Sequence, residues 1–183
     1  NSNMKKIIFV RVVLILTVLF SNQVTAQSFA GLDKSPMDVA AYPSSYRISD
    51  KLVKVIYSRP QLRRRSVIKL APNDKVWRTG ANEAAEITFY KDVNFGGKEV
   101  KSGTYTLFTI PGDKQWTVIL STAKNVWGAY SYSELEDVVR VSASVSTSKK
   151  SIEAFSIAFN GQENDATMYL GWGKLIVSVP VKG

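Results

Sequence analysis

Strict alternation of apolar and polar residues is the feature that most constrains how this chain folds. In the run Val139–Val145, apolar residues occupy every second position, and Arg or Ser occupies the positions between them. Successive side chains of a β-strand point to opposite faces of a sheet, so the run predicts a strand with one buried and one solvated face. A helix would need apolar residues three and four positions apart.

Similar runs recur along the chain, separated by short stretches rich in Gly, Pro, Asn and Asp, such as Asn94–Gly97 and Pro111–Asp113. These connections favour turns between neighbouring antiparallel strands. We therefore expect an all-β, antiparallel, jelly-roll-like β-sandwich of about seven to nine strands in a single domain. Helical character is confined to Ser133–Glu136 and Ser35–Ala41. The residues expected to point inward include Val53, Val55, Tyr57, Ile87, Phe89, Trp116, Val118, Leu120, Val139, Val141, Phe155, Ile157, Phe159, Met168, Leu170, Leu175, Val177, Val179 and Val181.

Residues 1–26 have the pattern of a secretory signal peptide. Lysines follow Met4, the segment Val12–Phe20 is uncharged and apolar apart from Thr17, and Val24–Ala26 supplies the small residues that a signal peptidase recognises. About nine apolar residues are too few for a membrane span, which needs roughly 20. We expect cleavage near Ala26, a periplasmic or secreted protein, and no transmembrane span in the mature chain.

The remaining chain is expected to consist of an irregular arm, residues 27–45, followed by the β domain, residues 46–183. Residues 1–3 precede the first Met and are expected to be extraneous. Cleavage would leave 21 of the 24 basic residues and all 15 acidic residues, a net charge of +6. The mature chain is therefore basic and long enough to bury a sizeable core.

The chain contains neither Cys nor His. This excludes disulfides, a lipid anchor on cysteine, Ser-His-Asp and Cys-His catalysis, and zinc sites built on imidazole or thiolate. Acid-base chemistry by carboxylates, lysine or tyrosine stays open, as do metals with oxygen ligands, such as calcium, and the absence of any chemistry. We expect no catalytic residues, no metal site and no cofactor, and we favour a protein that is not an enzyme.

Six segments resemble one bacterial family. They are VIYSRP at 55–60, VWRTGANEA at 76–84, SGTYTLFTIPG at 102–112, WTVIL at 116–120, WGAYSY at 127–132 and DVVRV at 137–141. They resemble the domain-of-unknown-function family number 2911, found in secreted or periplasmic proteins of Gram-negative bacteria. The resemblance implies a compact β domain behind a signal peptide, and it implies no particular activity, cofactor or substrate.

The first group of candidate ligand-binding residues is Arg59, Arg78, Asn82 and Glu83. Arginine offers a rigid fork of donors, asparagine offers donors and acceptors, and glutamate offers a carboxylate, so together they could grip an anionic or carbohydrate ligand. A structural role is the alternative, because Gly80 and Asn82 are turn formers and Arg78 could pair with Glu83 across the turn.

The second group is Trp127, Tyr130 and Tyr132, which lie in a stretch without clear periodicity. Exposed aromatic rings there could form a platform on which sugars stack, whereas buried rings would only extend the core. Both interpretations stay open.

The stretch from Arg59 to Arg78 contains seven basic residues and a single acidic one. It could be a solvated loop, or a surface for anionic glycans or lipids. Nucleic acid is a third option that export from the cytoplasm disfavours, so we expect no nucleic-acid partner.

Glycan hydrolysis would require two carboxylates about 5 to 9 Å apart, and no spacing in the sequence shows such a pair. Asn160–Asp165 is expected to be a hairpin connection rather than a calcium loop.

Our leading prediction is non-catalytic binding of an anionic or carbohydrate ligand or of an envelope protein. The alternatives are a carboxylate-dependent glycan hydrolase and a structural subunit of an envelope complex. The carboxylates that could serve a hydrolase are Glu83, Glu86, Asp92, Asp137, Glu163 and Asp165.

Overall fold

The computed structural model describes residues 2–8 and 27–183, and the chain divides into a unit up to Leu32 and a unit from Asp33 to Gly183. Residues 2–8 form a helix. The apolar segment and the cleavage site of the expected signal peptide lie outside the described residues. In the two described ranges, no helix is long and apolar enough to cross a membrane.

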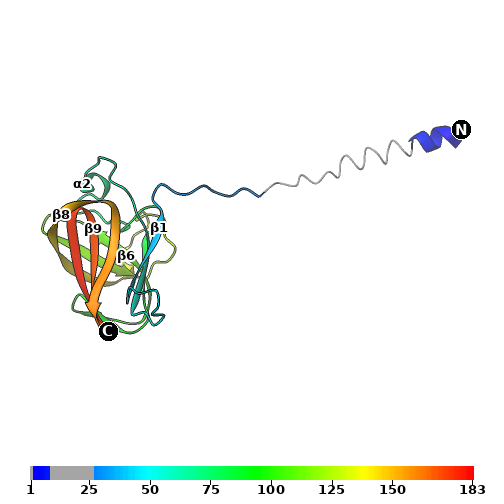
Figure 1. The fold of residues 1–183 in the computed structure, drawn as a ribbon. Coiled ribbons are helices and arrows are strands. Elements are labelled where there is room, and N and C mark those ends of the chain that lie inside the picture. Colours follow the sequence, from blue (N-terminus) through cyan, green and yellow to red (C-terminus); the bar gives the residue numbers. More distant parts are fainter. Residues whose placement is uncertain (1, 9–26) are drawn as a thin grey trace. The chain divides into compact units, whose positions relative to one another are not determined.

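Within the described residues, the second unit is built around an antiparallel sheet of nine strands (Figure 1). The strands lie in the order β1-β2-β3-β6-β7-β8-β9-β4-β5. A short helix, α2, and a 3-10 turn, η1, complete the unit, and the predicted antiparallel all-β fold is confirmed. The bounds are β1 Met37–Tyr42, β2 Val53–Ser58, α2 Val67–Leu70, β3 Ala85–Phe89, β4 Val93–Phe95, β5 Lys98–Val100, β6 Gly103–Ile110, β7 Gln115–Ser121, η1 Glu134–Glu136, β8 Asp137–Gln162 and β9 Asp165–Lys182.

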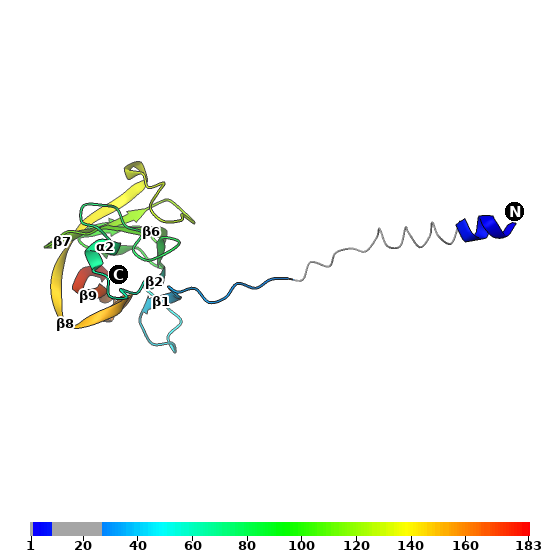
Figure 2. The same ribbon diagram turned by 90° about the horizontal axis from the view of Figure 1, so that it is seen from above.

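The long strand β8 joins the two halves of the sheet. Its first part, up to Ser144, pairs with β7, and the rest, from Val145 onward, pairs with β9. The register between β8 and β9 shifts on both sides of Ile152, and such irregularities bend a strand. Figure 2 shows β8 curving around the side of the domain. The strands therefore form one bent sheet, and the finer prediction of a sandwich is not confirmed.

One core cluster fills the inside of the bent sheet. It combines residues of the first half, such as Val55 and Ile87, with residues of the second half, such as Met168. At its centre Trp77 stacks on Trp172, with ring centroids 5.3 Å apart. Most residues that the alternation predicts to point inward are buried members of this cluster, whereas Phe159 and Leu175 are only partly buried and pack against it.

A second, smaller cluster lies on the other face of β6 and β7. It is formed by Ala84, Phe108 and Ile119, and side chains from two long loops cover it. Consequently Leu107 and Phe108, which point to opposite faces of β6, are both buried.

Strand β1 departs from the sequence-based expectation. The helical character predicted for Ser35–Ala41 is wrong, and the arm expected to be irregular contains this strand. β1 pairs along its whole length with β2, from Met37 opposite Ser58 to Tyr42 opposite Val53. A partner strand, rather than local composition, determines its conformation. The turn predicted at Ser133–Glu136 is confirmed by η1.

Candidate functional site

Two loops that are distant in sequence lie side by side above β6 and β7. We call residues 76–84 the signature loop and residues 122–132 the aromatic loop. The backbone N–H of Gly128 donates to the carbonyl of Asn82 at 2.9 Å, which joins the two loops. The segments WRTGANEA and WGAYSY, separate in the sequence, therefore form one surface.

The signature loop has an unusual backbone. Thr79 and Asn82 adopt positive φ angles of 53° and 62°. Asparagine tolerates this region, but a β-branched residue rarely adopts it. Thr79 is fully buried, and its hydroxyl lies 3.2 Å from the hydroxyl of Thr109 in β6. Trp77 forms a backbone bridge to the same Thr109, so the loop is held firmly on the sheet.

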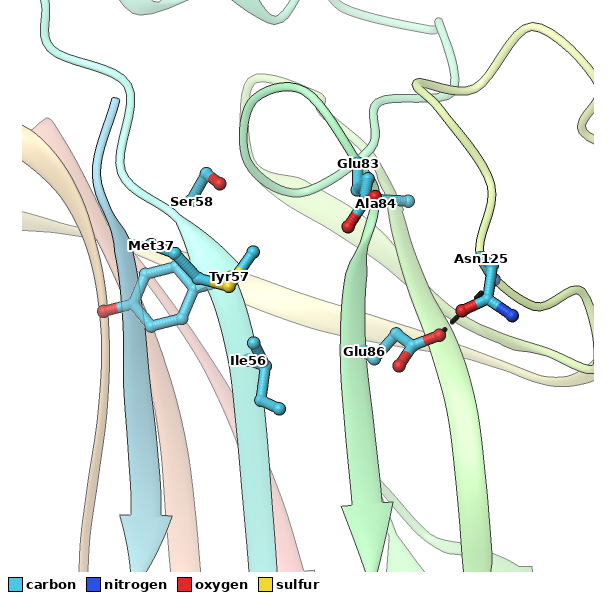
Figure 3. Close-up of a pocket in the computed structure, with 8 residues that line it drawn as sticks. All are labelled: Met37, Ile56, Tyr57, Ser58, Glu83, Ala84, Glu86 and Asn125. Carbon is cyan, nitrogen blue, oxygen red and sulfur yellow. Dashed lines mark hydrogen bonds between the residues drawn. The ribbon is translucent and has the colours of Figure 1, made fainter. Parts of the chain in front are cut away.

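An open groove runs between the signature loop and the adjoining parts of β1 and β2. Its larger recess measures about 230 Å³, and its smaller recess, shown in Figure 3, measures about 60 Å³. Both recesses share Met37, Ser58 and Glu83. The larger recess is lined by Asp33, Ser35, Met37, Ser58, Asn82, Glu83 and Trp127.

We call this feature the acidic groove, because Asp33, Glu83 and Glu86 line it. Among the described residues that line it there is no Lys or Arg. The carboxylate of Glu86 accepts a long hydrogen bond, 3.5 Å, from the backbone N–H of Asn125 (Figure 3). Within residues 27–183, the carboxylate of Glu83 has no hydrogen-bond or ion-pair partner. The groove therefore offers acceptors and negative charge to a ligand.

Trp127 forms the aromatic wall of the groove. Its side chain is 60% exposed, and its backbone forms an antiparallel bridge with Glu83. A large exposed ring beside a carboxylate gives the groove both an apolar face and a polar face.

The guanidinium of Arg78 interacts with other groups of the signature and aromatic loops. Its Nη1 donates to the carbonyl of Asn82 at 3.2 Å, and its guanidinium lies 5.6 Å from the ring centroid of Tyr130. The ion pair with Glu83 that the sequence suggested is not formed between these described residues. Arg78 and Tyr130 thus contact each other, and neither lines the recesses of the groove.

Arg59 is part of a separate structural contact. Its guanidinium donates to the carbonyl of Phe155 at 3.0 Å, to Asp38 at 2.9 Å and to the hydroxyl of Ser156 at 2.7 Å. These bonds tie the end of β2 to β1 and β8. Arg59 does not line the groove, although its neighbour Ser58 does.

Tyr132 belongs to a third location. Its hydroxyl donates to Asp137 at 2.6 Å and accepts from Arg140 at 3.0 Å, and Arg140 also pairs with Glu134. Its ring packs edge-on against Phe108. Burial, and then the hydrogen bond to the Asp137 carboxylate, raise the pKa of Tyr132 well above its ordinary value.

The structure therefore separates the seven candidate residues into three groups. Asn82, Glu83 and Trp127 line the groove, Arg78 and Tyr130 contact each other without lining it, and Arg59 and Tyr132 hold two other parts of the fold together. Sequence reasoning missed the contribution of Asp33 and Met37, because only the pairing of β1 with β2 brings them to the groove. In the described parts of the chain, no three carboxylates are grouped closely enough to hold a metal ion.

Comparison with known proteins identifies a family. A family model described as "Protein of unknown function (DUF2911)" matches residues 35–181, which include nearly the whole described sheet and both loops beside the groove. No curated protein and no solved structure matches the chain. Because the match covers well over half of its length, the chain belongs to the DUF2911 family.

Proposed function

We propose that this chain is an exported, non-catalytic binding protein of the bacterial envelope, and that it binds a carbohydrate in the acidic groove. The observation that carries the proposal is the position of exposed Trp127 beside the unpaired carboxylate of Glu83 and the amide of Asn82. An aromatic ring can pack against the apolar face of a sugar, while carboxylate and amide groups hydrogen-bond to its hydroxyls.

The charge of the groove favours a neutral sugar over an anion. Three carboxylates line it, whereas Arg59 and Arg78 direct their donors to groups of the chain itself. A carboxylate or phosphate ligand would meet charges of its own sign at short range, which costs free energy.

The volume of the groove indicates a small ligand. A recess of about 230 Å³ is below the roughly 300–1,000 Å³ that is typical of pockets enclosing drug-sized ligands. The ligand would therefore be a single sugar ring or the end of a chain, held at the surface.

Export is supported by the lysines near Met4, the apolar run that follows and the small residues before Gln27. Expression of the whole chain in a Gram-negative host should yield periplasmic protein whose first residue is Gln27. Recovery of the uncleaved chain from the cytoplasm would contradict this part of the proposal.

Carbohydrate binding can be tested by calorimetry with a panel of neutral and acidic glycans. Residues 27–183 are suitable for the test, because every described core residue lies between Ala40 and Val181. Trp127→Ala should weaken binding about tenfold or more. Tyr130→Ala is the matched control: this ring is 82% exposed but does not line the groove, so its removal should leave affinity unchanged.

Two results would contradict the proposal. One is that no neutral glycan binds the wild-type protein, and the other is that both aromatic variants lose affinity equally. Glu83→Gln adds a further check, because it keeps the shape of the groove and removes one charged acceptor. It should weaken binding of neutral sugars several-fold.

One observation favours a second function, carboxylate-dependent glycan hydrolysis. Glu83 and Glu86 line the same smaller recess, as two catalytic carboxylates would. That recess of about 60 Å³ has room for only a few water molecules at roughly 10–15 Å³ each, so it does not admit a sugar ring. Release of reducing ends from a glycan, abolished separately by Glu83→Gln and by Glu86→Gln, would establish the hydrolase instead.

A further inference from the structure

The net charge of the described β unit is concentrated at one end. Among the residues of the four segments 60–75, 111–115, 145–153 and 173–175, which we call the basic end, nine basic and three acidic residues give a net charge of +6. This equals the net charge of residues 27–183, so the other 12 basic and 12 acidic residues cancel. All nine basic side chains are exposed: Arg63, Arg64, Arg65, Lys69, Lys75, Lys114, Lys149, Lys150 and Lys174.

The fold itself assembles this end from distant parts of the chain. A Cβ at Gly173 would lie 3.1 Å from a methyl carbon of Val67, so α2 rests directly on β9. Figure 1 shows α2 at the end of the sheet away from the C-terminus. Hydrogen bonds join the other segments: Arg63 N to Glu153 Oε1 at 2.7 Å, Asp74 N to Pro111 O at 2.9 Å, and Val145 N to Lys114 O at 3.0 Å.

An exposed aliphatic side chain lies among these cations. Ile68 in α2 is 57% exposed and is followed directly by Lys69. Beside it is a recess of about 140 Å³, whose lining includes Val67, Ala71 and Leu175. Cationic residues around an exposed apolar group are typical of surfaces that lie in a membrane interface.

We propose that the basic end docks on an anionic membrane surface. Its arginines and lysines contact lipid phosphates, and Ile68 enters the boundary between headgroups and acyl chains. Several cations on separate segments favour an extended anionic surface over a single small ion. A polysaccharide or nucleic acid would use the same cations but would gain nothing from Ile68, which is why the lipid surface is the partner that fits best.

Vesicle binding tests the proposal directly. Residues 27–183 are used, because the apolar segment Val12–Phe20 would bind vesicles by itself. Sedimentation should show binding to phosphatidylcholine vesicles that contain phosphatidylglycerol, little binding to phosphatidylcholine alone, and weakening by salt. Equal binding to both kinds of vesicle, or to neither, would overturn the proposal.

Charge variants locate the contact. Each basic residue near an anionic surface is worth about fivefold in the binding constant, so replacing Lys149, Lys150 and Lys174 with Gln should weaken binding on the order of 100-fold. The matched control replaces Arg47, Lys98 and Lys124 with Gln, which gives the same net charge but leaves the basic end intact. Equal losses in the two triple variants would show that only the overall charge matters, and would overturn the proposed surface.

Ile68→Ser separates a membrane from other polyanions. It should weaken vesicle binding about tenfold while leaving the midpoint of thermal unfolding unchanged, because the side chain is exposed. Binding to a sulfated polysaccharide or a DNA duplex should not change. If vesicle binding is equally insensitive to Ile68→Ser, the surface recognises polyanions in general and the membrane proposal fails. This result would not affect the carbohydrate proposal, which concerns a different set of residues.

Discussion

At the scale of single residues, Arg59 shows how a side chain can look like a ligand-binding group and serve the fold instead. Its guanidinium has three partners, which belong to β1 and β8, whereas Arg59 itself directly follows β2. A planar group with several fixed donors is suited to such a junction, because each donor meets a differently placed acceptor.

We predict that Arg59→Ala lowers the free energy of unfolding by about 2 kcal/mol, because three hydrogen bonds to a half-buried charged group are lost. Arg59→Lys should recover only a small part, since one ammonium group cannot reach all three acceptors. Urea denaturation at neutral pH measures both effects. Arg47→Ala, at an exposed position, serves as the control and should change stability little; full stability of Arg59→Lys would contradict the structural role.

Tyr132 is a second residue whose role is internal. Burial and the bond to Asp137 raise the pKa of its phenol above the ordinary value of 10.0. The folded protein therefore holds this proton more tightly than the unfolded chain does. Its contribution to stability is complete below pH 10 and is lost as the pH rises from there toward the folded-state pKa.

The Tyr132→Phe variant should be less stable than wild type by about 1–2 kcal/mol at pH 7, because a hydrogen bond to a carboxylate is lost. This difference should shrink above pH 10, where only the wild type loses stability through the phenol. Chemical denaturation across the alkaline range provides the measurement. Tyr130→Phe, which alters an exposed ring, should show no such trend, and a constant difference for Tyr132→Phe would rule out the linkage.

At the scale of elements, the groove depends on how the aromatic loop is folded against the signature loop. Gly128 has a φ of 72°, and a Cβ there would lie 2.6 Å from the ring of Tyr130. Position 128 therefore requires glycine for two reasons: the backbone has a positive φ angle, and the ring of Tyr130 leaves no space for a Cβ.

We predict that Gly128→Ala displaces Tyr130 from Arg78 and lowers the free energy of unfolding by about 2 kcal/mol or more. Gly97→Ala is a matched control, because Gly97 has a φ of 91° but nothing within 4 Å of its added Cβ. Gly97→Ala should lower the free energy of unfolding by only about 1 kcal/mol, the contribution of backbone strain. Thermal or urea unfolding of the pair would show the difference, and equal losses would mean that contact with Tyr130 does not matter.

Strand β1 is the other element that shapes the groove. It lies at one end of the strand order, and Met37 and Val39 are 61% and 54% exposed on it. An edge strand with exposed apolar side chains is a place where another chain can pair. An envelope protein partner and a structural role in an assembly therefore stay predictions, and β1 is the element at which to test them.

At the scale of the whole molecule, the two halves of the sheet should unfold together, because they share β8 and a single main core. Trp77, Trp116 and Trp172 are buried in that core, whereas Trp127 is exposed. Tryptophan fluorescence therefore reports mainly on the core, and circular dichroism reports on the sheet.

The two signals should change with one midpoint when residues 27–183 are unfolded in urea, as expected for a single cooperative domain. Trp127→Phe should preserve most of the fluorescence change, since the three buried rings remain. Separate midpoints for fluorescence and circular dichroism would show that the halves of the sheet are independent.

The sequence by itself determined the class of fold and the inward face of most strands. Alternation is a local property: the positions of Val139 and Val141 already show which side of their strand is apolar, and the sheet buries both. The resemblance to the family was also readable, because motifs such as WRTGANEA are contiguous. Three of the seven ligand-binding candidates named from the sequence line the groove, whereas the other four lie elsewhere.

Only the tertiary structure decided which distant residues meet. The hydroxyl of Tyr57 contacts the backbone of Ile157, 100 positions away, and β1 becomes a strand only beside β2. Such contacts depend on how β8 bends and on which loops cover the sheet, and neither is encoded in the spacing of neighbouring residues. For this reason the sequence identified Glu83 and Arg59 as polar candidates, whereas the fold left the carboxylate of Glu83 open to the groove and gave the guanidinium of Arg59 three partners in the chain.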